Sequence, residues 1–298
     1  MELRRVGMIG LGAMGRPMAE HVARAGYALR LHDTEPGRAR EAAEATGGQA
    51  ANGPAGVAAA SDAVITMLPT GADVARTALD AGGLADGFAD GGVLIDMSSS
   101  EPSGTVALAA ALAGRGVGMI DAPVSGGRKG AVEGTLTIMA GGEAALVERC
   151  RPVLEAMGKR VVHTGAIGSG HALKALNNTI SAAGFLAAVE AFLVGKRFGL
   201  APETMAEVVN ASTGMNNATR NKLAQFVFSR GFDSGFSMDL MVKDLDIALD
   251  LARDTGTATP FAALSREIWA QAQQNLEPAR DHTEIVRWLE RLARAELR

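Results

Sequence analysis

The feature that most constrains the fold is a glycine-rich turn near the N-terminus, placed between an apolar segment and a helical pattern. Leu3–Ile9 is short and mostly apolar, as a buried strand is. A turn with glycine at positions 10, 12 and 15 follows, and a helix is predicted from there to about Ala25. Further strands are predicted at 28–32, 63–67 and 93–96, each followed by a helical stretch. This alternation predicts an α/β fold, a doubly wound parallel sheet with helices on both faces.

The spacing of the three glycines indicates what binds at this turn. Gly10 permits a tight turn, Gly12 lets the backbone approach a pyrophosphate, and Gly15 allows close packing of helix on strand. The helix that follows offers unpaired N–H groups to an anion. Because the turn lies between a strand and a helix, it predicts a Rossmann-type dinucleotide-binding domain. The predicted cofactor contacts here are the six turn residues, namely Gly10, Leu11, Gly12, Ala13, Met14 and Gly15.

The end of the second strand bears on the choice of cofactor. Asp33 follows the strand Ala28–His32 at a spacing that suits a carboxylate bound to the adenosine ribose. A carboxylate there would repel a 2′-phosphate, so NAD is favoured over NADP. The nearby Arg30 and Arg38 keep NADP open as an alternative. Asp33 also suits a cap or turn residue before the helix start at Glu35-Pro36.

The carboxyl ends of the next strands provide candidates for the nicotinamide half of the cofactor. Ligands bind at this edge of a parallel sheet. Leu68, Pro69 and Asp73 follow the strand at 63–67, and Ser99 follows the strand at 93–96. Ordinary turn and cap chemistry is the alternative for each of these residues.

A second glycine turn is a candidate substrate site. Asp121-Ala-Pro-Val-Ser125-Gly126-Gly127 ends in a stretch whose successive N–H groups can form an anion nest, with a carboxylate substrate as the occupant. A plain loop with Ser125 capping the next helix fits the spacing equally well. Arg128 and Lys129 either assist a second anionic group or face water.

A third turn, from Gly165 to Gly170, introduces a long apolar helix that carries a single lysine. Strands predicted at 134–142 and 160–163 complete the first domain, so the predicted domains are 1–164 and 165–298. Lys174 and Asn178 are four residues apart and therefore project from one side of the helix. The helix is predicted to be buried nearly all round, and a buried lysine is costly unless it is used or paired.

This helix has two other interpretations. It could be a core helix whose lysine extends to the surface. It could also span a membrane, since Ala175–Gly195 is apolar and of about the right length. Asn178, Ser181 and Glu190 argue against a membrane span, because polar groups are costly in lipid.

The second half of the chain is predicted to be helical almost throughout. The polar segment 210–217 suits a turn, and the phenylalanines at 226, 228, 232 and 236 suit a core. Lys243 lies near Asp246 and Asp250 on helical steps, either as a solvated pair or as a second lysine that reaches into a cleft. The final helix, at about 281–297, is expected to lie at the surface or at a subunit contact.

Composition excludes several classes of function. The chain has 298 residues, is 47% hydrophobic and carries a net charge of −4, which suits a soluble protein with two domains. Without a basic excess, no nucleic-acid partner is expected. Cys150 is the single cysteine, so no intrachain disulfide or cysteine metal site is expected and a cytoplasmic location fits best. Neither a targeting segment nor a metal site is expected.

Four motifs, in order, resemble the β-hydroxyacid dehydrogenases, a group that includes 3-hydroxyisobutyrate dehydrogenase and tartronate semialdehyde reductase. The motifs are Gly10 to Ala19, Asp121 to Gly127, Gly165 to Asn178 and Lys243-Asp-Leu-Asp-Ile-Ala248. The resemblance covers nearly the whole chain. It implies a Rossmann domain, an all-helical domain, a long helix between them, and a homodimer or homotetramer.

The resemblance also implies residue roles. It makes Lys174 catalytic and places Ser125, Gly126, Gly127 and Asn178 at the substrate. Lys243 would lie near the nicotinamide, while Leu68, Pro69, Asp73 and Ser99 match cofactor-contact positions.

The predicted activity is hydride transfer between NAD(H) and a short 3-hydroxy acid or its semialdehyde. Burial would lower the pKa of Lys174 and let it act as general acid or base, with Asn178 orienting the reacting group. Reduction of tartronate or succinic semialdehyde remains an alternative within the family. An imine reductase is a rival, although that group usually lacks this lysine, and a non-catalytic dinucleotide-binding protein is another. Phosphogluconate oxidation is disfavoured, because such enzymes have a much larger helical domain.

Overall fold

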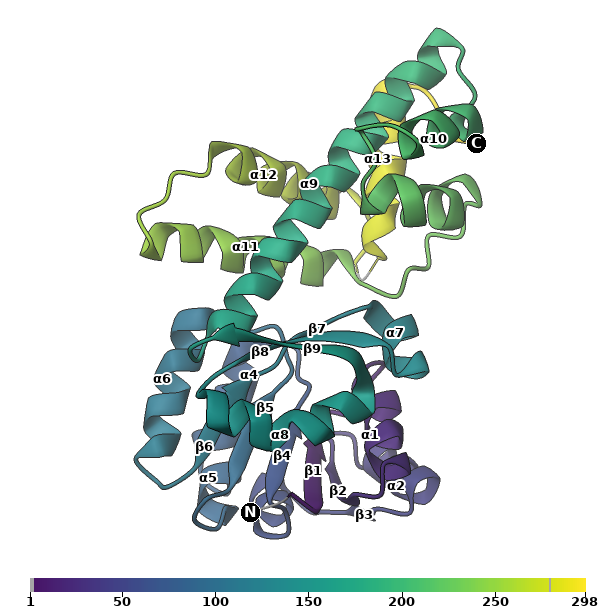
Figure 1. Ribbon diagram of the computed structural model, residues 1–298. Coiled ribbons are helices and arrows are strands. Elements are labelled where there is room, and N and C mark those ends of the chain that lie inside the picture. The colour runs from purple at the N-terminus through teal and green to yellow at the C-terminus, as the bar shows by residue number, and fades with distance from the viewer. Residues whose placement is uncertain (1–2, 279) are drawn as a thin grey trace. The chain divides into compact units, whose positions relative to one another are not determined.

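A computed structural model describes residues 3–278 and 280–298 and divides the chain into two compact units, Met1–Lys174 and Ala175–Arg298 (Figure 1). The division falls inside the long helix α9 (Ser169–Phe198), whereas the sequence placed it before that helix. Its first turns belong to the first unit because they are bonded to the carboxyl edge of the sheet. Each unit has its own hydrophobic core.

The first unit is built on one sheet with the strand order β3-β2-β1-β4-β5-β6-β8-β7, in which β9 also pairs with β8. Pairing is parallel from β3 to β6 and antiparallel where β8 meets β6 and β7. The strands are β1 (Arg5–Ile9), β2 (Ala28–His32), β3 (Gln49–Ala50), β4 (Ala63–Thr66), β5 (Val93–Asp96), β6 (Gly118–Asp121), β7 (Val124–Ser125), β8 (Leu136–Gly141) and β9 (Gly158–Gly165). The predicted alternation of strands and helices is confirmed.

Helices cover both faces of this sheet, because successive strand residues point to opposite sides. In β5, Val93 and Ile95 pack in one core and Leu94 packs in the other. The first core also takes residues of α1 (Gly15–Arg24), α2 (Pro36–Thr46) and α8 (Ala144–Met157). The second takes residues of α3 (Pro54–Ala59), α4 (Gly71–Leu79), α5 (Leu84–Gly87) and α6 (Pro102–Ala113). A short α7 (Gly127–Glu133) links β7 to β8.

The described residues of the second unit form helices joined by loops, with an isolated β-bridge between Ser237 and Asp281. The unit contains most of α9, then α10 (Pro202–Asn210), the π-helix η1 (Ala218–Phe228), α11 (Met238–Asp254), α12 (Pro260–Asn275), the 3-10 turn η2 (His282–Glu284) and α13 (Ile285–Ala293). Its core includes Phe185 of α9, Leu245 of α11 and Trp269 of α12. At the C-terminus, α13 buries Ile285, Val286 and Leu289 in this core and leaves Leu292 64% exposed, and the expected subunit contact there stays a prediction.

Helix α9 is not buried all round, contrary to expectation. Ile180 is 74% exposed and Phe198 is 84% exposed, and Leu173, Leu176 and Val194 are exposed as well. The opposite face, with Phe185, Val189 and Phe192, fills the helical core. Among the described residues α9 is also long and apolar enough to cross a membrane, with 56% of its most apolar window buried. The core helix of a soluble protein passes the same test, so this finding is weak evidence of a span.

Candidate active site

The three glycines of the first turn serve two different purposes. Gly10 has a φ of +91°, and a Cβ there or at Gly15 would collide with backbone oxygens of Met67 or Gly10. A Cβ at Gly12 would meet no atom within 4 Å. Packing therefore requires Gly10 and Gly15, whereas Gly12 leaves open space in front of the helix start. Since α1 has no side-chain cap, this space suits the pyrophosphate of a dinucleotide.

Asp33 closes this turn from the second strand. It is 7% exposed, and its carboxylate accepts hydrogen bonds from the backbone N–H of Leu11 at 2.8 Å and of Glu35 at 2.9 Å. Arg38 lies 3.9 Å from Asp33 and 2.8 Å from the carboxylate of Glu35. The turn role of Asp33 is thus seen directly, and its ribose contact stays a prediction.

Among the residues predicted to contact the nicotinamide half of the cofactor, Leu68 and Asp73 are held by hydrogen bonds to nearby residues. The N–H of Leu68 donates to Ser98 Oγ at 3.0 Å. Asp73 and Thr70 cap α4 reciprocally, and Asp73 also pairs with Arg76. Pro69 is exposed and Ser99 half-buried. The observed contacts of Asp73 are therefore those of a helix cap, and contact of these four positions with a cofactor stays a prediction.

The sequence interpretation missed a buried polar cluster at the carboxyl ends of β5 and β6. The carboxylate of Asp121 accepts hydrogen bonds from the N–H of Gly168 at 2.7 Å and of His171 at 2.8 Å. It therefore caps α9 from a distant strand. His171 Nδ1 lies 2.8 Å from Thr105 Oγ1, and its Nε2 lies 3.6 Å from a carboxylate oxygen of Asp96. The cluster fixes the first turn of the helix that carries Lys174.

Glycine explains how this helix comes so close to the sheet. A Cβ at Gly170 would collide with the carbonyl oxygen of Met139 and lie 2.8 Å from a carboxylate oxygen of Asp121. A Cβ at Gly141 would lie 2.8 Å from Ser169 Oγ. The glycines of this turn thus allow α9 to pack closely against the sheet. The sequence feature that indicates this close packing is the run of residues without side chains.

The second glycine turn contains two successive glycines with positive φ, and its role as an anion site stays a prediction. Ser125 ends β7, and Gly126 and Gly127 have φ values of +131° and +59°. A Cβ at Gly127 would meet no atom within 4 Å. Arg128 and Lys129 are exposed, and Lys129 lies 4.0 Å from Glu133. The turn therefore presents open backbone, while the observed contact of Lys129 is with its own helix.

Asn178 is held by a residue whose importance the sequence interpretation missed. Asn178 is 7% exposed, and its Nδ2 donates to a carboxylate oxygen of Asp244 at 2.6 Å. The other oxygen of Asp244 lies 3.1 Å from Lys243 Nζ. Asp246 pairs with Arg266, and the two alternatives for Lys243, a solvated pair or a lysine that reaches into a cleft, stay predictions. Asp244 thus faces α9, whereas Asp246 faces α12.

Lys174 lies one turn beyond His171 on α9 and is half-buried. In an α-helix its side chain projects from the same side as that of Asn178. No group of three or more potential metal ligands occurs within residues 3–278 and 280–298. This part of α9 therefore offers a titratable lysine, Lys174, next to the oriented amide of Asn178.

The fold and these side chains define a nicotinamide-dependent oxidoreductase, and comparison with known proteins identifies its family. A model described as the NAD binding domain of 6-phosphogluconate dehydrogenase matches residues 5–165. One described as NAD-binding of NADP-dependent 3-hydroxyisobutyrate dehydrogenase matches residues 168–289. The chain belongs to the β-hydroxyacid dehydrogenase family and is an NAD(P)-dependent hydroxyacid oxidoreductase.

Individual relatives cover most of the chain. A 2-(hydroxymethyl)glutarate dehydrogenase of Eubacterium barkeri is 39% identical over 265 residues, which is 89% of this chain and 88% of the relative. An NAD-dependent L-serine dehydrogenase of Pseudomonas aeruginosa is 35% identical over 90% of this chain and 91% of the relative. The solved structure of Mycobacterium tuberculosis 3-hydroxyisobutyrate dehydrogenase with L-serine is 32% identical, with a TM-score of 0.89, covering 97% of this chain and 99% of that one.

Proposed function

We propose that the protein transfers a hydride between NAD(H) and a short 3-hydroxy acid or its semialdehyde, with Lys174 as the general acid or base. The observation that carries this proposal is the construction of α9. Its first turn is capped by Asp121, and the amide of Asn178 is held by Asp244. Together these contacts support a fixed lysine and a fixed amide on one helix face.

Lys174 and Asn178 divide the handling of the hydroxyl group. A bound nicotinamide supplies the acceptor for the hydride. The substrate hydroxyl must lose its proton as it becomes a carbonyl, and neutral Lys174 accepts that proton or, in reverse, returns it. Asn178 Nδ2 has two protons and uses one on Asp244, so the other can be donated to the substrate oxygen.

The carboxylate of the substrate is assigned to the turn Ser125-Gly126-Gly127. Successive N–H groups with positive φ values create a concave positive site, and the serine hydroxyl adds a further donor. Binding the carboxylate there determines which carbon faces the cofactor. Such positioning contributes as much to the rate as the proton transfer itself.

The names of the relatives narrow the substrate class. 2-(Hydroxymethyl)glutarate, L-serine and 3-hydroxyisobutyrate all carry a hydroxymethyl group on the carbon next to a carboxylate. They differ in the remaining substituent at that carbon, which is a carboxyethyl, an ammonium or a methyl group. We propose that this chain oxidises a substrate with the same 3-hydroxypropanoate core, or reduces its semialdehyde.

NAD is the proposed cofactor in preference to NADP. The carboxylates of Asp33 and Glu35 both lie at the end of β2, where a 2′-phosphate would have to fit. The guanidinium of Arg38 is close to both carboxylates, which reduces its availability for a phosphate.

Two further proposals concern assembly and location. The apolar residues exposed on α9, among them Ile180 and Phe198, support a homodimer or homotetramer formed through the helical unit. A cytoplasmic location is proposed from the single cysteine. Cys150 is buried, and burial raises the pKa of its thiol to about 12, so it is unreactive and consistent with a reducing compartment.

The test is the absorbance of reduced nicotinamide with the wild type and Lys174→Met, offered 2-(hydroxymethyl)glutarate, L-serine, 3-hydroxyisobutyrate and a cyclic imine. We expect turnover of at least one hydroxy acid, and a loss of about 10²- to 10⁴-fold in kcat for the variant with NADH binding retained. Lys159→Met, at an exposed lysine of the same unit, is the matched control. Near-full turnover by Lys174→Met would refute the lysine mechanism. Turnover of the imine alone would identify an imine reductase, and binding without any turnover a non-catalytic protein.

A further inference from the structure

His171 is a buried side chain at the start of α9, three residues before Lys174. It is 1% exposed and lies in the first unit together with Asp96 of β5, Thr105 of α6 and Asp121 of β6. The backbone N–H of His171 completes the helix cap on Asp121, which leaves the imidazole without an assigned role. An imidazole beside two carboxylates is either neutral or positively charged, and its hydrogen bonds distinguish the two forms.

The contacts of Thr105 determine where one ring proton lies. The Thr105 hydroxyl has a single proton, which it donates to the carbonyl oxygen of Glu101 at 3.0 Å. The same hydroxyl oxygen lies 2.8 Å from His171 Nδ1 and therefore accepts at that contact. Nδ1 consequently carries a proton and donates it to Thr105.

The other ring nitrogen of His171 lies beside a carboxylate. Nε2 is buried and 3.6 Å from a carboxylate oxygen of Asp96, and it has no hydrogen-bond partner among residues 3–278 and 280–298. Without a proton, the lone pair of Nε2 would lie next to a negatively charged oxygen, which is repulsive. With a proton, the same contact becomes an attraction between opposite charges.

Carboxylates lie on both sides of this imidazole. Asp96 is on the Nε2 side and Asp121 lies 3.9 Å from Nδ1, and each is at most 1% exposed. Both accept from neutral donors, among them Thr66 Oγ1 and the N–H of Gly168, and such bonds leave the negative charge in place. A positive charge between two buried carboxylates offsets part of the cost of burying them. Lys174 follows one turn later on α9, and the proposed function uses it in its neutral form.

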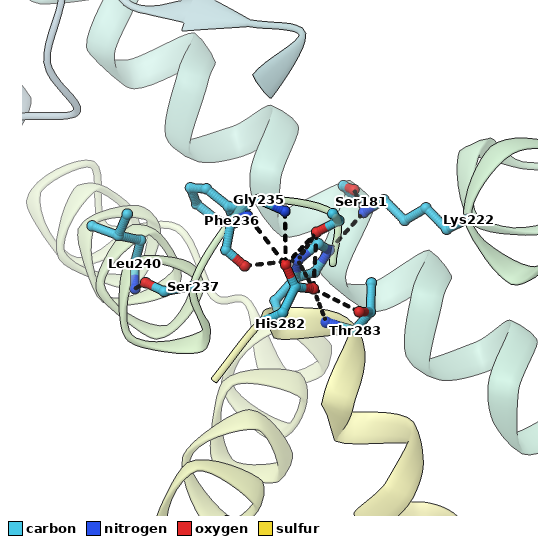
Figure 2. Close-up of polar contacts among 10 residues, drawn as sticks. Ser181, Lys222, Gly235, Phe236, Ser237, Leu240, His282 and Thr283 are labelled. Carbon is cyan, nitrogen blue, oxygen red and sulfur yellow. Dashed lines mark hydrogen bonds and ion pairs between the residues drawn. The ribbon is translucent and has the colours of Figure 1, made fainter. Parts of the chain in front are cut away.

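A second buried histidine, His282 of η2, shows the effect of a positively charged neighbour (Figure 2). It is 3% exposed, and its Nε2 lies 3.1 Å from Lys222 Nζ, which reaches it from η1. Burial and the ammonium of Lys222 lower the pKa of His282 to about 4, although Asp281 opposes this shift. His282 is therefore neutral near pH 7. At His171 the charged neighbours on both sides of the ring are carboxylates, so their electrostatic effect has the opposite sign.

We propose that His171 is a positioning residue that acts as an imidazolium: its positive charge joins Asp96 and Asp121 to the first turn of α9 and so sets the direction of Lys174. This inference rests on the proposed function, in which Lys174 handles the proton of the substrate hydroxyl. Residues three apart are neighbours on one face of a helix. A first turn that shifts when the charge is lost therefore moves Lys174 with it.

The charge is measured on the wild type near neutral pH, from the ¹⁵N chemical shifts of the histidine ring nitrogens. Both nitrogens of an imidazolium carry protons and have similar shifts, whereas in a neutral ring the nitrogen without a proton is shifted far from the other. The signals are assigned with the variants His21→Gln, His32→Gln, His163→Gln and His282→Gln. We expect two protonated nitrogens at His171 and one at His282. A neutral ring at His171 would overturn the proposal.

A second experiment tests positioning through turnover. His171→Gln retains an N–H group that can donate to Thr105 but removes the charge. His21→Gln, at a half-buried histidine of α1 that contacts the carbonyl oxygen of Val132, is the matched control. We expect His171→Gln to lose about 10- to 100-fold in kcat with the Kd of NADH unchanged, and His21→Gln to keep the kcat of the wild type.

An unchanged kcat in folded His171→Gln would show that the residue does not position Lys174. The nitrogen shifts of the wild type decide the charge even if this variant does not fold. Failure of the proposed function has a different result, since the wild type would then turn over no hydroxy acid. A neutral His171 ring in an enzyme whose turnover depends on Lys174 would refute this inference alone.

Discussion

Asp244→Asn is the substitution that best separates the construction of the site from its chemistry. Asp244 is 1% exposed and accepts from Asn178 at 2.6 Å, with Lys243 at 3.1 Å. The amide oxygen of the variant can still accept from Asn178. Its NH₂ group would then face the ammonium of Lys243, so the charge-assisted contact is lost within the core.

The size of the effect follows from the burial of these groups. A hydrogen bond to a charged group contributes about 1.5–3 kcal/mol. The side chain of Lys243 is 19% exposed, so solvent screens part of this interaction. We therefore expect a loss of roughly 1–3 kcal/mol in the free energy of unfolding. Because a neutral amide oxygen holds Asn178 less firmly than a carboxylate does, kcat should fall by about 10- to 100-fold, with NADH affinity unchanged.

Urea denaturation and steady-state turnover measure the two effects, with Asp246→Asn as the matched control on the same helix. Asp246 is 44% exposed and pairs with Arg266, so its loss should cost less than about 1 kcal/mol and leave turnover unchanged. If the two variants were equally stable and equally active, the assignment of Asp244 as the residue that positions Asn178 would be wrong. A stability loss without any loss of kcat would restrict Asp244 to a role in folding.

Two further predictions concern the cofactor. In Asp33→Asn the amide oxygen can still accept from Leu11, but the negative charge is gone, so the ratio of kcat/KM with NADPH to that with NADH should rise about tenfold. An unchanged ratio would show that Asp33 serves the turn alone. Gly12→Ala should weaken NADH binding with little change in the urea midpoint, since its Cβ meets open space, whereas Gly15→Ala should cost about 1–3 kcal/mol of stability. Equal stability of the two glycine variants would contradict the separate roles of these residues.

The first unit was largely predictable because its signals are local. A strand, a glycine turn and a helix follow each other within the first 25 residues, and the strands at 28–32 and 93–96 coincide with β2 and β5. Each of these elements is specified by the period of its own residues and by its own turn. The exposed side of α9 was not predictable in this way. Periodicity reports which residues are apolar, but whether other parts of the chain cover them depends on packing far away in sequence.

The residues that orient the site escaped prediction for the same reason. Asp121 and His171 are 50 positions apart, and Asn178 and Asp244 are 66 positions apart. In the motif Lys243-Asp-Leu-Asp, Asp246 is three residues beyond Lys243, which is a helical step. The sequence interpretation therefore considered Asp246 as a partner of Lys243 and overlooked Asp244. The structure shows Asp244 turned towards α9 instead, and a pattern along one helix carries no information about which neighbouring helix each side chain faces.

The same argument applies to the polar contacts along α9. Lys174 and Asn178 lie on one helix at a fixed spacing, so their shared direction follows from helix geometry. Lys222 reaches that helix from η1, 41 residues beyond its partner Ser181 in sequence. The direction that Lys174 and Asn178 share is therefore local information, whereas the contact between Lys222 and Ser181 depends on how η1 packs against α9, which no local pattern reports.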